Sequence, residues 1–111
     1  MNNFLDINQL SKNCLRAIIK EAKSIKERRA GFTNGATDTH KVFNNLVVGL
    51  IFEKPSTRTR VSFDVGVKQM GGQSIILSTA DLQLGHGENI SDTAQALSLY
   101  LDMITIRTSD E

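Results

Sequence analysis

The sequence of 111 residues contains one cysteine, one proline and no tryptophan, and only 5% of its residues are aromatic. The single cysteine, Cys14, cannot form a disulfide within the chain, and no group of cysteines and histidines has the spacing of a metal site. The scarcity of aromatic side chains argues against stacking platforms for single-stranded nucleic acid. A net charge of +1 gives no general attraction to DNA or to anionic membranes.

Long hydrophobic runs are also missing, and no run approaches the length needed to span a bilayer. The first residues lack the basic region and apolar segment of a secretory signal, so we expect a cytoplasmic protein. Hydrophobic residues make up 40% and charged residues 23%, as in an ordinary globular protein. The length allows one domain with a modest core.

Residues 8–29 have the periodicity of an amphipathic helix, with Asn8 as its expected N-cap and Cys14 expected to be buried. More than half of the 13 basic residues lie in this segment. Binding of nucleic acid or membrane is one interpretation, but interleaved Glu21 and Glu27 favour a solvated outer face. The expected buried face consists of Leu10, Cys14, Leu15, Ile18, Ile19, Ala22 and Ile25.

Beyond a polar loop at residues 31–41, in which we expect His40 to be exposed, strand and helix patterns alternate. The predicted elements are a buried strand at 46–52, a helix at 57–70, a strand at 74–77, a helix after Asn89 as N-cap, and a strand at 103–106. This order predicts the α/β class: a parallel sheet flanked by helices, with a βαβαβ core and right-handed crossovers after the N-terminal helix.

Side chains expected to face the core follow from the helical spacing. The second helix should bury Phe63, Val67 and Met70, and Gly66 should permit close packing. Gly71 and Gly72 should end this helix. The third helix should bury Ala94, Leu97 and Leu101.

The turn at residues 52–60, which joins the first strand to its helix, is rich in groups that bind anions. Pro55 ends the strand, and the helix that follows presents free N–H groups and the positive end of its dipole. The donors that predict a phosphate site are the hydroxyls of Ser56, Thr57 and Thr59 and the guanidinium groups of Arg58 and Arg60. Of these two arginines, we expect one to face the ligand and the other to form a structural ion pair.

Two further segments should reach the same edge of the sheet, because ligands of parallel α/β sheets gather beyond the carboxyl ends of the strands. These segments are the loop at residues 78–88 and Arg107, which ends the third strand. A surface ion pair of Arg107 with Asp102 or Asp110 is the alternative. Next to an anion-binding turn, however, a strand-end arginine supplies a second guanidinium for a dianion.

Three blocks carry a family resemblance: Ser56–Phe63, Gln83–Ala94 and Asp102–Thr108. In order and spacing they resemble the carbamoyl-phosphate-binding part of the aspartate and ornithine carbamoyltransferases, over residues 46–108. The loop around Gln83 contains no lysine, whereas aspartate carbamoyltransferases have one in this loop, so the resemblance favours the ornithine branch.

The resemblance implies transfer of a carbamoyl group from carbamoyl phosphate to ornithine, without a metal or organic cofactor. It implies that Ser56, Thr57, Arg58 and Thr59 bind the phosphate, and that Arg107 and Thr59 reach the carbonyl oxygen. Arg58, Thr59 and Arg107 would be the catalytic residues. It also implies a homotrimer in which Gln83 reaches the substrate of a neighbouring subunit.

Residues 1–111 match only part of that domain, because a His-Pro-x-Gln segment would follow Glu111. The second domain, which holds ornithine in the family, is also absent, so we expect this part alone to be inactive and to leave apolar surface unburied. Two alternatives stay open. The acceptor is aspartate, acetylornithine or a diamine, or the chain is a non-catalytic anion-binding or assembly module.

Overall fold

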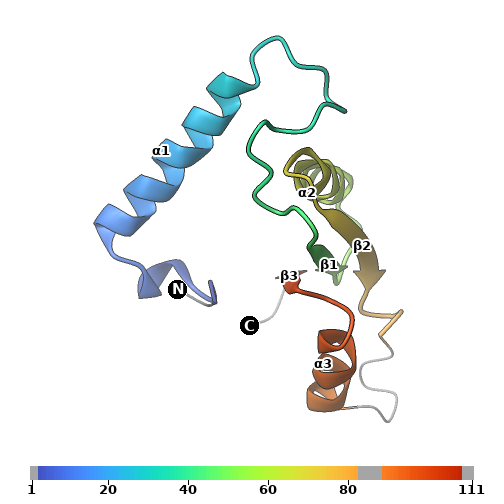
Figure 1. Ribbon diagram of the computed structural model, residues 1–111. Helices are drawn as coiled ribbons and strands as arrows, with labels where there is room; N and C mark the ends of the chain where they lie inside the picture. Colours follow the sequence, from blue (N-terminus) through green and yellow to red (C-terminus); the bar gives the residue numbers. More distant parts are fainter. Residues whose placement is uncertain (1–2, 83–88, 109–111) are drawn as a thin grey trace. The chain divides into compact units, whose positions relative to one another are not determined.

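The computed structural model describes residues 3–82 and 89–108, and its chain divides into two compact units, Met1–Phe32 and Thr33–Glu111 (Figure 1). The first unit contains the 3-10 helix η1 (Ile7–Gln9) and the helix α1 (Lys12–Arg28). The second contains, in order, β1 (Val47–Phe52), α2 (Thr57–Gln69), β2 (Gln73–Ser78), α3 (Ile90–Ser98) and β3 (Met103–Arg107). None of the described helices is long and apolar enough to cross a membrane.

In the first unit, the predicted long helix is divided at Ser11, whose extended backbone separates η1 from α1. The Ser11 side chain accepts the N–H of Cys14 and caps α1, so the prediction of Asn8 as the N-cap is wrong. Asn8 lies instead inside η1, where its N–H donates to Asp6. The chain therefore begins its main helix four residues later than the periodicity indicated.

The apolar face of α1 is not covered. Neither η1 nor α1 has a buried residue, and Cys14, predicted to be buried, is only half-buried. A helix stripe becomes buried only where another element packs on it, and among residues 3–32 the short η1 is the only other helix or strand of this unit. The opposite face is solvated as expected, with Glu21 paired to Arg28 at 3.2 Å.

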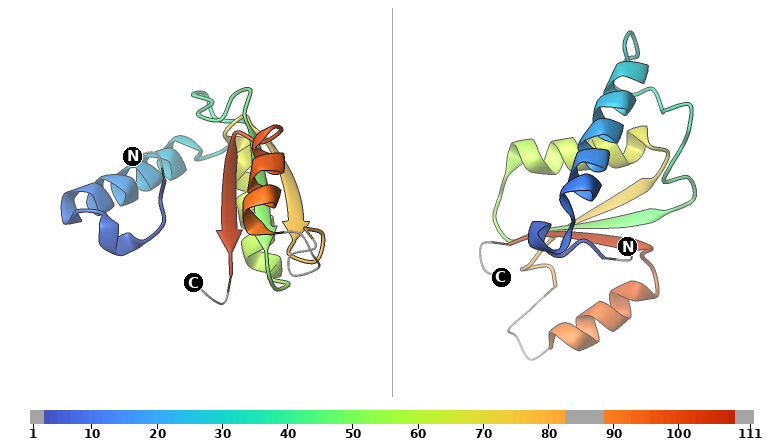
Figure 2. Two further views of the ribbon diagram at one scale, coloured as in Figure 1. Left: turned by 90° about the horizontal axis from the view of Figure 1, so that it is seen from below. Right: turned by 90° about the vertical axis from the view of Figure 1, so that its left-hand side faces the viewer.

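The second unit is a three-stranded parallel sheet in the order β2-β1-β3, which confirms the predicted fold class. Helices α2 and α3 lie on opposite sides of this sheet (Figure 2). The connection through α2 runs from β1 to β2, and the connection through α3 runs back from β2 past β1 to β3. Because these two crossovers run in opposite directions along the sheet, the right-handed rule for parallel strands places their helices on opposite faces. Phe52, the last residue of β1, pairs with Ser78 of β2 and with Arg107 of β3, so all three carboxyl ends share one edge.

The core lies around β1, which is buried on both faces. Val48, Leu50 and Phe52 form one cluster with Val67 of α2. On the other face, a Cβ atom at Gly49 would lie 2.6 Å from the Leu101 Cδ1 atom, so glycine here lets the end of the α3 segment approach the sheet. The continuous apolar run in the sequence is explained by this double coverage.

Details of the helix faces differ from the expectation. Phe63 is 44% exposed, although Val67 on the same side of α2 is buried. In the third helix, Ala94 is exposed and Thr93 is buried instead, while Leu101 is buried as predicted. The helix is only nine residues long, so a small rotation exchanges neighbouring positions at its core boundary. Asn89 caps it as predicted, accepting the N–H of Asp92 at 2.7 Å.

Of the glycines in and directly after α2, one does not have the expected role and one does. A Cβ atom at Gly66 would meet nothing within 4 Å, so the idea that Gly66 permits close packing is wrong. Gly71 follows the helix with φ +86°, a conformation that favours glycine, and a Cβ there would lie 2.7 Å from the Lys41 Cβ. The helix end therefore depends on Gly71, as predicted.

These two glycines form a matched pair for a stability test. Gly66→Ala should stabilise the fold by about 0.5–1 kcal/mol, because it removes backbone freedom without a clash. Gly71→Ala should destabilise it by at least about 1–2 kcal/mol, because alanine resists the left-handed conformation. Urea unfolding midpoints check both values, and equal effects of the two substitutions would contradict this account.

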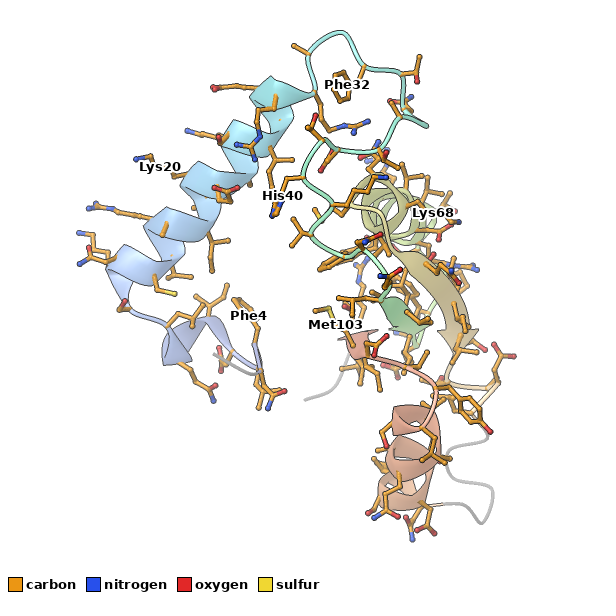
Figure 3. All side chains as sticks on the ribbon, in the orientation of Figure 1. Phe4, Lys20, Phe32, His40, Lys68 and Met103 are labelled. Carbon is orange, nitrogen blue, oxygen red and sulfur yellow. The ribbon has the colours of Figure 1, made fainter. Side chains whose placement is uncertain are left out.

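A polar contact joins α2 to β2. The Asp64 carboxylate accepts a short hydrogen bond from the Ser74 hydroxyl and two bonds of 3.0 Å from Lys68, which is labelled in Figure 3. The Ser74 hydroxyl, and then the Lys68 ammonium, lower the pKa of Asp64 from its ordinary value of 3.8. Asp64 therefore stabilises the fold in its charged form, with only 24% of its side chain exposed.

The direction of this pKa shift gives a pH-dependent prediction. The stabilisation should be present above the unfolded pKa of Asp64 and should disappear as the pH falls through the lower folded value. Ser74→Ala should therefore cost stability at neutral pH and much less in acid, where Asp64 is protonated. Urea unfolding across this pH range measures the difference. Ser98→Ala, which removes a hydroxyl bonded to the Gln95 carbonyl, should cost the same at every pH.

Candidate functional site at the carboxyl edge of the sheet

The N-terminus of α2 is arranged differently from those of α1 and α3. Ser11 and Asn89 cap their helices with side-chain hydrogen bonds, whereas Ser56, at the N-cap of α2, makes no capping bond. Its hydroxyl donates to the Thr59 hydroxyl at 3.1 Å instead. The first N–H groups of α2 therefore have neither an intrahelical acceptor nor a side-chain cap among the described residues.

Arg107 lies at this helix end. Its Nη1 atom donates to the Ser56 hydroxyl at 2.6 Å and to the Thr59 hydroxyl at 2.5 Å. The alternative of an ion pair with Asp102 is excluded, because Asp102 lies at the opposite end of β3, where it accepts the N–H of Val47 at 2.9 Å. Asp110, the other suggested partner, lies outside the described residues. Residues separated by about 50 positions thus meet at one edge.

Thr57 and Arg58, at the start of α2, border an open pocket. Together with apolar side chains of α2, they line this pocket of about 640 Å³. The remaining lining residues are Asn34, Val61, Ser62, Val65, Gly66 and Gln69. The structure therefore separates the predicted phosphate-binding residues into two groups, with Ser56, Thr59 and Arg107 in direct contact and Thr57 and Arg58 beside the pocket.

The two arginines of the turn, Arg58 and Arg60, are both exposed. Within residues 3–82 and 89–108 neither guanidinium group forms a hydrogen bond or an ion pair, so the structural ion pair expected for one of them is not observed there. Gln83, predicted to contact the substrate, lies outside the described residues. No group of three or more potential metal ligands occurs in the described part of the chain.

Two residues at this edge, Glu53 and Thr108, were not identified from the sequence. The Glu53 N–H donates to the Arg107 carbonyl at 3.0 Å, and the Thr108 hydroxyl donates to the Glu53 carboxylate at 2.7 Å. The available signal was their position, since each directly follows one of two neighbouring parallel strands. At the end of β2, Ser78 similarly binds Asp81, and its backbone and hydroxyl donors lower the pKa of that carboxyl group.

The arrangement combines three kinds of donor at one edge: free helix N–H groups, hydroxyls and a guanidinium. Arg107 uses only Nη1 for its bonds to described residues, so Nη2 and Nε can bind another acceptor. Such a group can hold an oxyanion by several charge-assisted hydrogen bonds at once.

A parallel α/β unit with these donors at its carboxyl edge is of the kind that can bind a phosphate group. Residues 2–111 match the family model described as the carbamoyl-P binding domain of aspartate/ornithine carbamoyltransferase. The chain therefore belongs to the aspartate/ornithine carbamoyltransferase family, as its motifs indicated.

Curated relatives agree with this assignment. The ornithine carbamoyltransferase of Roseobacter denitrificans is 59% identical over 111 residues, which are 100% of this chain and 36% of that protein. The ornithine carbamoyltransferase of Ruegeria pomeroyi is 58% identical over 111 residues, which are again 100% of this chain and 36% of that protein. The chain thus spans about a third of the length of the curated relatives that it matches.

Solved structures share the fold. Ornithine carbamoyltransferase from Pyrococcus furiosus superposes with a TM-score of 0.82 at 37% identity, over 96% of this chain and 32% of that one. The catalytic subunit of M. jannaschii aspartate transcarbamoylase superposes with a TM-score of 0.78 at 28% identity, over 100% of this chain and 35% of that one. Both neighbours are carbamoyltransferases.

Proposed function

We propose that this chain is the carbamoyl-phosphate-binding part of an enzyme that transfers a carbamoyl group from carbamoyl phosphate to ornithine, giving citrulline and phosphate. One observation carries the proposal: Arg107 reaches the uncapped N-terminus of α2 and binds both Ser56 and Thr59. The phosphate would lie at the free N–H groups of the first turn, with Ser56, Thr57, Arg58 and Thr59 as its ligands.

The chemistry follows from where charge develops. Attack of the ornithine amine on the carbonyl carbon builds negative charge on the carbonyl oxygen and then on the departing phosphate. Arg107 and the Thr59 hydroxyl would bind the first charge, and Arg58 with the helix N–H groups would bind the second. Fixed donors of this kind lower the barrier, and the loss of one typically costs about 10²–10³ in rate. Holding both substrates together contributes further.

Ornithine is favoured as the acceptor by the curated relatives at 58–59% identity, which are named ornithine carbamoyltransferases. Among the solved structures, four ornithine carbamoyltransferases are 27–37% identical, whereas an aspartate transcarbamoylase is 28% and an acetylornithine transcarbamylase 26% identical, so the preference for ornithine depends on the curated relatives. We place the ornithine site in a second domain of a longer chain, because the present residues span 36% of those relatives. Catalysis would need that longer chain.

We also propose that the longer enzyme is a cytoplasmic homotrimer with sites shared between subunits. Gln83 would bind carbamoyl phosphate held by a neighbouring subunit. The family resemblance of the loop around Gln83 supports this role.

The roles of the arginines can be tested in the complete carbamoyltransferase chain, with ornithine as acceptor and citrulline formation as the readout. Arg58→Ala and Arg107→Ala should each reduce kcat/KM for carbamoyl phosphate by about 10²–10³, because each removes a donor to developing charge. Arg60→Ala is the matched control and should change it by less than about tenfold. Equal losses for Arg58→Ala and Arg60→Ala would contradict the assignment, and wild-type protein without citrulline formation would refute the function.

The shared site can be tested by subunit mixing. Trimers formed from Gln83→Ala chains and Arg107→Ala chains should regain activity that neither parent has, because some interfaces then combine two intact contributions. Recovered activity is compared with that of mock-mixed parent trimers. Absence of recovery in verified mixed trimers would show that Gln83 does not act across the interface.

A further inference from the structure

The ends of β1 and β3 are joined beyond the last paired residues of the sheet. Phe52 pairs with Arg107, and one step further the Glu53 N–H donates to the Arg107 carbonyl at 3.0 Å. The next residue, Thr108, turns its hydroxyl back to the Glu53 carboxylate at 2.7 Å. Glu53 thus binds the backbone of Arg107 and the side chain of the residue after it.

These bonds complete a closed ring of contacts. From Glu53 the chain runs through the turn to Ser56, whose hydroxyl accepts a bond from the Arg107 guanidinium at 2.6 Å. The hydrogen bond from the Thr108 hydroxyl to the Glu53 carboxylate closes the ring. An arginine side chain has several rotatable bonds and loses about 2 kcal/mol of rotamer entropy when it is fixed. Restraining its backbone on both sides reduces the number of directions in which its guanidinium can point.

The negative charge of the Glu53 carboxylate is unfavourable for an anion-binding site. A negative charge near the N-terminus of α2 opposes the binding of an anion there. Its presence is explained if the carboxylate contributes as a hydrogen-bond acceptor more than it costs as a charge. A neutral acceptor of the same shape would then serve at least as well.

We propose that Glu53 and Thr108 are positioning residues, and that their hydrogen bond holds Arg107 in the orientation that binds the anionic substrate. This inference rests on the proposed function of Arg107. Neither residue touches the substrate in this account. Both act only through the direction of the Arg107 side chain, so their effect on ligand binding should disappear when that side chain is removed.

The test uses the complete enzyme chain and measures kcat, KM for carbamoyl phosphate and Kd for inorganic phosphate. Thr108→Val, which replaces the hydroxyl by a methyl group, should weaken binding of both ligands about 5- to 10-fold, the usual effect of one hydrogen bond. Thr108→Ser keeps the hydroxyl and should stay within about twofold of wild type. Glu53→Gln, which keeps an acceptor without the charge, should bind as well as wild type or better, whereas Glu53→Ala should bind less well.

A double-mutant cycle separates positioning from a general structural effect. In an Arg107→Ala background, Thr108→Val should cause no further loss of kcat/KM for carbamoyl phosphate, because the side chain that it orients is gone. An equal loss in both backgrounds would overturn the inference, as would a Thr108→Val enzyme that binds like wild type. A wild-type enzyme that binds neither ligand would overturn the proposed function itself, so the two failures are distinguishable.

Discussion

The parallel pairing of β1 with a strand on each side is the constraint on which the rest of the second unit depends. Parallel strands end at the same edge, so the residues that leave Phe52 and Arg107 emerge next to each other whatever the length of the intervening chain. Burial of β1 on both faces fixes this pairing, because Val48, Leu50 and Phe52 pack with Val67 of α2 on one face and Leu101 approaches Gly49 on the other. The site is a consequence of the sheet.

The same constraint explains how a small number of polar groups can form a candidate anion site. Ser56 would cap α2 in an ordinary helix, but here its hydroxyl is bonded to Arg107 and Thr59. The helix N–H groups are thereby left without a side-chain cap while hydroxyls and a guanidinium gather beside them. A local loss of capping is compensated by long-range contacts, a pattern typical of functional rather than purely structural helix ends.

Much of this could be predicted from the sequence, because the signals are strong and local. The apolar run at residues 46–52, Gly71 and the Asn89 cap each have one dominant physical interpretation, and all three were confirmed. Arg107 was placed correctly at the edge because topology alone dictates it. The direction of an exposed side chain is not encoded in this way, so the separation of Arg58 from Arg107 was not foreseen.

Other errors have equally specific causes. Asn8 and Ser11 are both good capping residues, and periodicity cannot decide between them when the apolar pattern continues through both. Gly66 looked like a packing glycine, yet nothing lies near it, because a glycine in a helix does not reveal what faces it. The contact of Thr108 with Glu53 joins positions 55 residues apart, and neither carries a motif.

The contact of Arg107 with the start of α2 also links ligand affinity to the order of assembly. The helix end is built from residues close in sequence, whereas Arg107 arrives only when β3 docks against β1. An anion held by both parts would bind the assembled sheet and not a chain in which β3 is detached. By mass action such a ligand would stabilise the pairing of β1 with β3, the two neighbouring strands that are farthest apart in the sequence. Once binding is saturated, the free energy of unfolding would rise in proportion to the logarithm of the ligand concentration.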